Sequence, residues 1–148
     1  CFTSDLNNCP IFSKDYPIII YEALHHTSNM HATIEKFLAF GYKKIFFVEP
    51  TSNILIRLLS KIGVSERIEY SGVKPGRLNL KKLRYLCKEY KYTSIIKTRW
   101  YFPEDYFNKY LKKIIPSQFV FLNTLNIFSL ITNFINFGNQ SIIYLKKE

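Results

Sequence analysis

The chain has 148 residues, of which 47% are hydrophobic and 22% are charged. This composition is typical of a globular domain and excludes disordered, collagen-like and coiled-coil proteins. The 5 glycines and 6 prolines are too few for a flexible linker or a low-complexity protein. The formal net charge of +10 favours anionic partners such as nucleic acid, nucleotides or acidic membranes, although net charge carries no information about fold.

Strands and helices alternate in the first half of the chain. Residues 17–23 contain three consecutive isoleucines and predict a buried strand. Thr27 or Ser28 is expected to cap a helix over residues 30–38, which Gly41 ends. A second strand is expected over residues 44–48, followed by a helix over residues 54–62.

The alternation continues in the second half. Asn79 is expected to cap a helix, and Pro103 is expected at the first position of another. Further strands are expected over residues 67–73, 93–97, 119–122 and 141–145, with an ambiguous helix over residues 125–137.

This β–α alternation predicts an α/β protein with βαβ crossovers. We expect a Rossmann-like three-layer sandwich with a mostly parallel sheet of about six strands, in a single domain over residues 1–148. Residues 1–15 are expected to be an irregular lead-in, and residues 16–148 the alternating core. The chain begins at Cys1 without an initiator methionine, so we expect it to be truncated at the N-terminus.

The cysteines and the most apolar tract bear on location. Cys1, Cys9 and Cys87 form no CxxC pair, so neither a zinc site nor a disulfide framework is predicted. This pattern favours a reducing, cytoplasmic location. Asparagine, serine and threonine interrupt the apolar residues 119–137, so we expect no membrane span.

Ligands of open α/β sheets bind at the carboxyl ends of the strands, and polar residues follow three of the expected strands. The first such segment begins at Glu22 and contains His25 and His26. Either histidine could act as a general base, because imidazole titrates near neutral pH; the alternative is a pair of surface-loop histidines. No HExxH spacing is present, so no metal site is expected.

Glu49 and Arg99 end two further strands. A carboxylate at the end of a second strand can accept both hydroxyls of a ribose, which would give Glu49 a role in nucleotide binding. The alternative is that Glu49 is a solvated carboxylate before Pro50. Lys97 or Arg99 could neutralise a phosphate or carboxylate of a small ligand.

Residues 37–53, FLAFGYKKIFFVEPTSN, resemble the second-strand region of FkbM-type S-adenosylmethionine-dependent methyltransferases, where the strand ends in Glu-Pro. The resemblance implies S-adenosylmethionine as cofactor, with Glu49 matching the ribose-binding acid and Glu22 near the acidic position of the first-strand motif. It also implies that the segment from Glu22 to Asn29 faces the cofactor. The cofactor-binding residues expected on this basis are Glu22, His25, Ser28, Asn29, Glu49 and Asn53, and the expected catalytic residues, which would touch substrate, are His26 and Arg99.

The first-strand loop departs from the family pattern. That loop is glycine-rich in the family, whereas residues 23–29 contain no glycine, so side chains occupy the space where backbone would approach the cofactor. We therefore expect a divergent or inactive methyltransferase acting on a small-molecule or glycan substrate. The Gly-Tyr-Lys-Lys-Ile segment at residues 41–45 is also similar to sialyltransferase-like enzymes, so a nucleotide-sugar-dependent glycosyltransferase fragment is the first alternative.

The positive charge is concentrated in residues 51–115, where 15 basic and 5 acidic residues give a net charge of +10. Aromatic residues are interleaved with the later basic ones, as in modules that bind single-stranded nucleic acid. A non-enzymatic nucleic-acid-binding module is therefore the second alternative. The competing interpretation is a solvated helix face, because the basic residues of this helix fall opposite its apolar positions. These basic residues are Lys81, Lys82, Arg84, Lys88 and Lys91.

Overall fold

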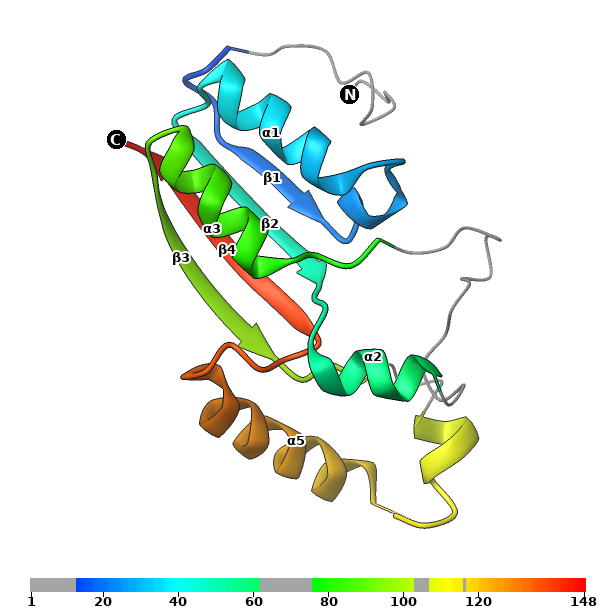
Figure 1. The fold of residues 1–148 in the computed structure, drawn as a ribbon. Coiled ribbons are helices and arrows are strands. Elements are labelled where there is room, and N and C mark those ends of the chain that lie inside the picture. Colours follow the sequence, from blue (N-terminus) through cyan, green and yellow to red (C-terminus); the bar gives the residue numbers. More distant parts are fainter. Residues whose placement is uncertain (1–12, 62–75, 103–106, 116) are drawn as a thin grey trace.

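The computed structural model describes residues 13–61, 76–102, 107–115 and 117–148. Four strands form one sheet in these ranges, namely β1 (Ile18–Tyr21), β2 (Lys44–Pro50), β3 (Tyr92–Arg99) and β4 (Gln140–Lys147), in the order β1-β2-β4-β3. β1 pairs parallel with β2, whereas β4 is antiparallel to both of its neighbours. β1, β2 and β3 therefore run in one direction and end at the same edge of the sheet (Figure 1).

The expected α/β class is confirmed, but the expected sheet was wrong in size and direction. The described part of the chain has four strands and not about six, and the sheet is mixed because β4 runs against the others. Residues 119–122, expected as a strand, belong to helix α5 (Gln118–Asn133). Short apolar runs have no periodicity that separates a strand from a helix, which explains this error. The strand expected over residues 67–73 lies outside the described residues.

Three helices follow the expected positions closely, because their ends are set by neighbouring residues, whereas α5 (Gln118–Asn133) differs at both ends from the helix expected over residues 125–137. α1 (Met30–Phe40) ends at Gly41, which has a left-handed φ of 86°. Its N-cap is Asn29 and not Thr27 or Ser28, and the Asn29 side chain accepts a hydrogen bond from Ala32 N.

Two further helices also begin at asparagine caps. Asn53 accepts a hydrogen bond from Ile56 N at the start of α2 (Ile54–Lys61), and Asn79 caps α3 (Leu80–Glu89) as expected. The short elements η2 (Leu24–His26) and η3 (Phe107–Leu111) each form a single turn. Of the helix expected to begin at Pro103, the first residues lie outside the described ranges.

The core lies between the sheet and the pair α1 and α3, which cover the same face (Figure 1). Alternate strand residues such as Ile20, Phe47 and Leu145 point into it. Burial raises the pKa of the Cys87 thiol to about 11 and that of the Tyr92 hydroxyl to about 12. Tyr92 Oη donates to the carbonyl oxygen of Tyr42 at 2.7 Å, which ties β3 to the end of α1.

The opposite face of the sheet carries large apolar side chains that stay exposed. Ile19, Phe46, Tyr144 and Ile95 lie in one row across the four strands. Ile19 is 72% and Ile95 is 59% exposed, whereas Phe46 and Tyr144 are half-buried. The expected third layer is therefore not formed over this row by the residues that the structure describes. α5 instead lies beyond the carboxyl edge of the sheet (Figure 1).

Candidate functional site

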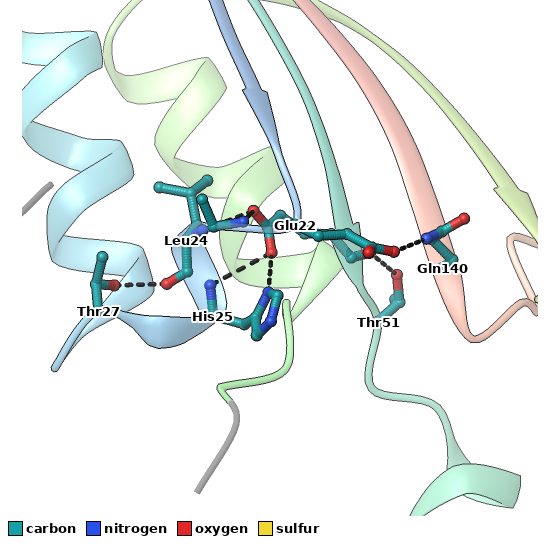
Figure 2. Close-up of polar contacts among 8 residues, drawn as sticks. Glu22, Leu24, His25, Thr27, Thr51 and Gln140 are labelled. Atoms are coloured by element: carbon teal, nitrogen blue, oxygen red, sulfur yellow. Dashed lines mark hydrogen bonds and ion pairs between the residues drawn. The ribbon is translucent and has the colours of Figure 1, made fainter. Parts of the chain in front are cut away.

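The candidate site is the edge of the sheet where β1, β2 and β3 end and β4 begins. Figure 2 shows that this edge brings together Glu22 after β1, Thr51 after β2 and Gln140 at the start of β4. Glu49 lies one residue before the end of β2, and Arg99 is the last residue of β3. Since strands far apart in the sequence meet here, each polar side chain has partners that its own segment does not supply.

Glu49 is fully buried and binds the segment after β1. Its Oε1 accepts hydrogen bonds from the backbone N–H of Ala23 at 3.0 Å and of Leu24 at 2.7 Å. Its Oε2 accepts from the backbone N–H of His25 at 3.3 Å and lies 2.8 Å from His25 Nδ1 (Figure 2). Ala23, the N-cap of η2, makes no side-chain capping bond, so a carboxylate from the neighbouring strand caps this turn.

These contacts define the surroundings of Glu49 in detail. Its carboxylate is neither a solvated group nor an open acceptor, because three backbone N–H groups and one imidazole surround it. A buried carboxylate with four charge-assisted contacts is a strong anchor for a loop. In this structure Glu49 positions the segment between β1 and α1.

The two consecutive histidines lie in different environments. The His25 ring is buried against Glu49, whereas His26 is exposed, and the ring centroids are 4.1 Å apart. Gly76 N donates to the carbonyl oxygen of His25 at 3.0 Å, so a second segment also holds this turn. His26 is therefore the histidine that faces solvent at the sheet edge.

Glu22 and Arg99 are linked through Gln140. Arg99 Nε donates to Gln140 Oε1 at 2.6 Å, and Gln140 Nε2 donates to Glu22 Oε1. The buried amide thus presents its oxygen to the cation and its nitrogen to the carboxylate. Glu22 has a φ of 45°, a left-handed conformation that is uncommon for a residue with a side chain.

Sequence reasoning missed Gln140 and Ser141, and it placed Thr51 only among the polar residues that follow the second expected strand. The hydroxyl groups of Thr51 and Ser141 form a hydrogen bond, and both residues are buried. The only signal for Gln140 and Ser141 in the sequence is that two polar residues open an otherwise apolar strand. Their role depends on β4 lying between β2 and β3, which the sequence did not reveal.

The remaining expected site residues lie at helix starts. Asn29 caps α1, and Asn53 caps α2 while its Nδ2 donates to the carbonyl oxygen of Gly138 at 2.8 Å. Ser28 is exposed next to Asn29. The structure therefore brings Glu22, His25, Glu49 and Arg99 to one edge, with Asn29 and Asn53 in capping positions beside it.

Two features bear on other classes of site. Within the described ranges, no three His, Cys, Asp or Glu side chains come together as a metal ion would require.

The basic residues of α3, namely Lys81, Lys82, Arg84 and Lys88, are exposed on the side opposite its buried leucines. That arrangement is the amphipathic pattern of a helix on a core.

Comparison with known proteins supports the fold. No protein-family model matches the chain, and no curated protein matches it. Among solved structures, the magnesium protoporphyrin IX methyltransferase ChlM from Synechocystis PCC 6803 with bound SAH matches 99% of this chain and 50% of that chain, with 11% sequence identity and a TM-score of 0.56. The match to a SAM-dependent methyltransferase from Archaeoglobus fulgidus covers 99% of this chain and 66% of the Archaeoglobus chain, with 17% sequence identity and a TM-score of 0.49.

The chain spans half the length of the Synechocystis methyltransferase that it matches. At this level of identity the likeness concerns the fold, and fold alone does not establish activity. The chain therefore has a methyltransferase-like α/β fold with a four-stranded mixed sheet in its described residues.

Proposed function

We propose that this chain is part of a divergent S-adenosylmethionine-dependent methyltransferase, and that the carboxyl edge of its sheet contacts the ligand. The observation that carries the proposal is the Glu22–Gln140–Arg99 linkage at this edge, in a fold like that of the Synechocystis methyltransferase. Ligands of open α/β sheets bind at this edge, so the position and the chemistry agree. The FkbM-type resemblance of residues 37–53 remains a prediction.

The polar groups fit the expected cofactor in part. Glu22 is partly exposed, and its carboxylate has the chemistry to accept ribose hydroxyl or ammonium protons. Arg99 is exposed, and its guanidinium can bind a carboxylate. Glu49 and the N–H groups of the following turn bind one another, so we assign Glu49 and His25 to positioning the loop.

The residues of this chain would act by binding and orientation. S-adenosylmethionine supplies an electrophilic methyl group when it is bound. Methyl transfer depends mainly on holding donor and acceptor in line, so it needs no acid–base pair. Glu22 and Arg99, fixed through the buried Gln140, would orient polar groups of the ligand, and His26 would accept a proton from the acceptor on the solvent side.

Calorimetric titration with S-adenosylhomocysteine tests this function. We expect binding to the full chain that Glu22→Gln weakens about tenfold, the size expected for one charged hydrogen bond. Lys88→Gln is the matched control, because Lys88 is an exposed residue on α3 and takes no part in the linkage. Absence of heat at millimolar ligand, or equal affinity of wild type and Glu22→Gln, would refute the proposal. Tighter binding of a nucleotide sugar in the same titration would favour the glycosyltransferase alternative.

A nucleic-acid-binding function is the second candidate, and the exposed basic face of α3 favours it. It requires affinity for single-stranded RNA or DNA that decreases steeply with salt concentration. Replacement of Lys81, Lys82, Arg84 and Lys88 by glutamine should then abolish binding. Affinity that does not change with salt would exclude this candidate.

A further inference from the structure

Three polar side chains in the C-terminal half of helix α5, namely Ser129, Thr132 and Asn133, lie on the side that faces the protein, whereas Asn123, Thr124 and Asn126 are exposed. Ser129 and Thr132 are buried, and Ser129 Oγ accepts a hydrogen bond from the backbone N–H of Trp100 at 2.8 Å. Asn133 Oδ1 accepts from the backbone N–H of Thr98 at 2.9 Å. β3 is an edge strand, so these two side chains satisfy backbone donors at the end of that edge. Polar contacts therefore fix which side of α5 faces the protein.

The opposite side of α5 is apolar and exposed. Ile127, Leu130, Ile131, Phe134 and Ile135 are between 59% and 91% exposed, and we call them the outward stripe. Their spacing of i, i+3, i+4, i+7 and i+8 places them on one side of the helix and of the turn that follows it. A contiguous apolar surface of this kind marks an interaction site. In Figure 1, α5 lies along the margin of the molecule, away from α1 and α3.

The charges around the outward stripe favour an anionic partner. Residues 107–139, which include η3 and α5, contain three lysines and no aspartate or glutamate. Lys112 and Lys113 are exposed shortly before α5, and the adjacent Ile114 is 76% exposed. A second copy of the chain would bring like charges together at this surface. An anionic lipid surface would instead receive apolar side chains at its acyl boundary and lysines at its headgroups.

The length of α5 also limits how it can meet a bilayer. Its 16 residues extend over about 24 Å, less than the roughly 30 Å of a hydrocarbon core. In the described ranges, none of the helices has the length and apolarity needed to cross a bilayer. A helix that exposes one apolar side can instead lie in the plane of the interface.

We propose that α5 docks this protein onto anionic membranes, with the outward stripe at the acyl boundary and Lys112 and Lys113 on lipid phosphates. The proposal is independent of the methyltransferase function, because it uses no residue of the Glu22–Gln140–Arg99 linkage.

Flotation of the full chain with vesicles tests the proposal. We expect binding to vesicles of phosphatidylcholine with phosphatidylglycerol that exceeds binding to phosphatidylcholine alone. The double variant Leu130→Gln and Phe134→Gln should reduce this binding at least about tenfold, because it removes two central apolar side chains. The control Ile19→Thr and Ile95→Thr removes two exposed apolar side chains from the sheet and should bind as wild type does.

Three further measurements separate the possible outcomes. Lys112→Gln with Lys113→Gln should remove the preference for anionic vesicles, and circular dichroism should show unchanged helix content in every variant. Absence of vesicle binding, or equal binding by the stripe variant, would overturn the proposal. Light scattering that shows a dimer which the stripe variant dissociates, without vesicle binding, would assign the stripe to a second copy of the chain.

Discussion

Replacement of Glu49 by alanine tests whether one buried carboxylate holds the turn after β1. The substitution removes the acceptor of three backbone N–H groups and the partner of His25 Nδ1, and all of these contacts are between 2.7 and 3.3 Å long. The remaining groups stay in a buried turn, since Leu24 and His25 are both buried. Backbone donors without an acceptor in such a place are costly.

The expected loss of stability is about 3–5 kcal/mol, because several buried donors lose their acceptor at about 1–3 kcal/mol each and these losses do not add fully. A simple sum of four charge-assisted hydrogen bonds at about 1.5–3 kcal/mol each would exceed this range, but contacts that share one carboxylate do not add. Glu49→Gln keeps one acceptor oxygen for the turn and places an N–H₂ group near His25, so we expect a smaller loss of about 1–3 kcal/mol.

Urea unfolding followed by circular dichroism measures these losses, and an unchanged slope would confirm that only stability has changed. Glu89→Gln is the matched control, because Glu89 is an exposed carboxylate at the end of α3, and we expect it to change stability by less than about 0.5 kcal/mol. If Glu49→Ala unfolds as close to wild type as this control does, the Glu49 carboxylate does not anchor the turn.

Three further predictions concern the packing of the sheet. A Cβ atom at Gly138 would lie 2.5 Å from the carbonyl oxygen of Arg99. Gly138→Ala should therefore shift the backbone and lower the free energy of unfolding in urea by about 1–3 kcal/mol. An unfolding midpoint equal to that of wild type would contradict this close packing. Because the pKa of Cys87 is about 11, its side chain should be a thiolate in about one molecule in a thousand at pH 8. A thiol reagent should therefore label Cys87 only after unfolding. Rapid labelling of the native protein would contradict the burial of this thiol. Tyr92→Phe should cost about 1–2 kcal/mol, because the carbonyl oxygen of Tyr42 loses its buried donor. The unfolded chain releases the Tyr92 proton near pH 10 and the folded chain near pH 12, so the free energy of unfolding of the wild type should decrease between pH 10 and pH 12. In Tyr92→Phe this decrease with pH should be less steep. An equal decrease in both proteins would contradict the assigned pKa.

The sequence predicted α1, α2 and α3 well, because the signals that end a helix are local. Asn79 and Gly41 act within a few residues of their own position, and both have the predicted role in the structure. The carboxyl-edge location of Glu22 and Arg99 also follows from the expected strands, since both residues come directly at strand ends. Asn29 replaced the predicted caps of α1 because three polar residues in a row offer equivalent local signals.

The sequence by itself thus determined the α/β class, the cap of α3 and the end of α1 at Gly41, and it predicted the edge at which a ligand would bind. The tertiary structure decided the direction of β4, the burial of Glu49 and the linkage of Glu22 to Arg99 through Gln140. It also decided that α5 faces the protein with its serine and threonine side chains and solvent with its isoleucines. The physical reason is distance along the chain: Glu22 and Gln140 are separated by 118 positions, and only the order of strands in the sheet brings them into contact.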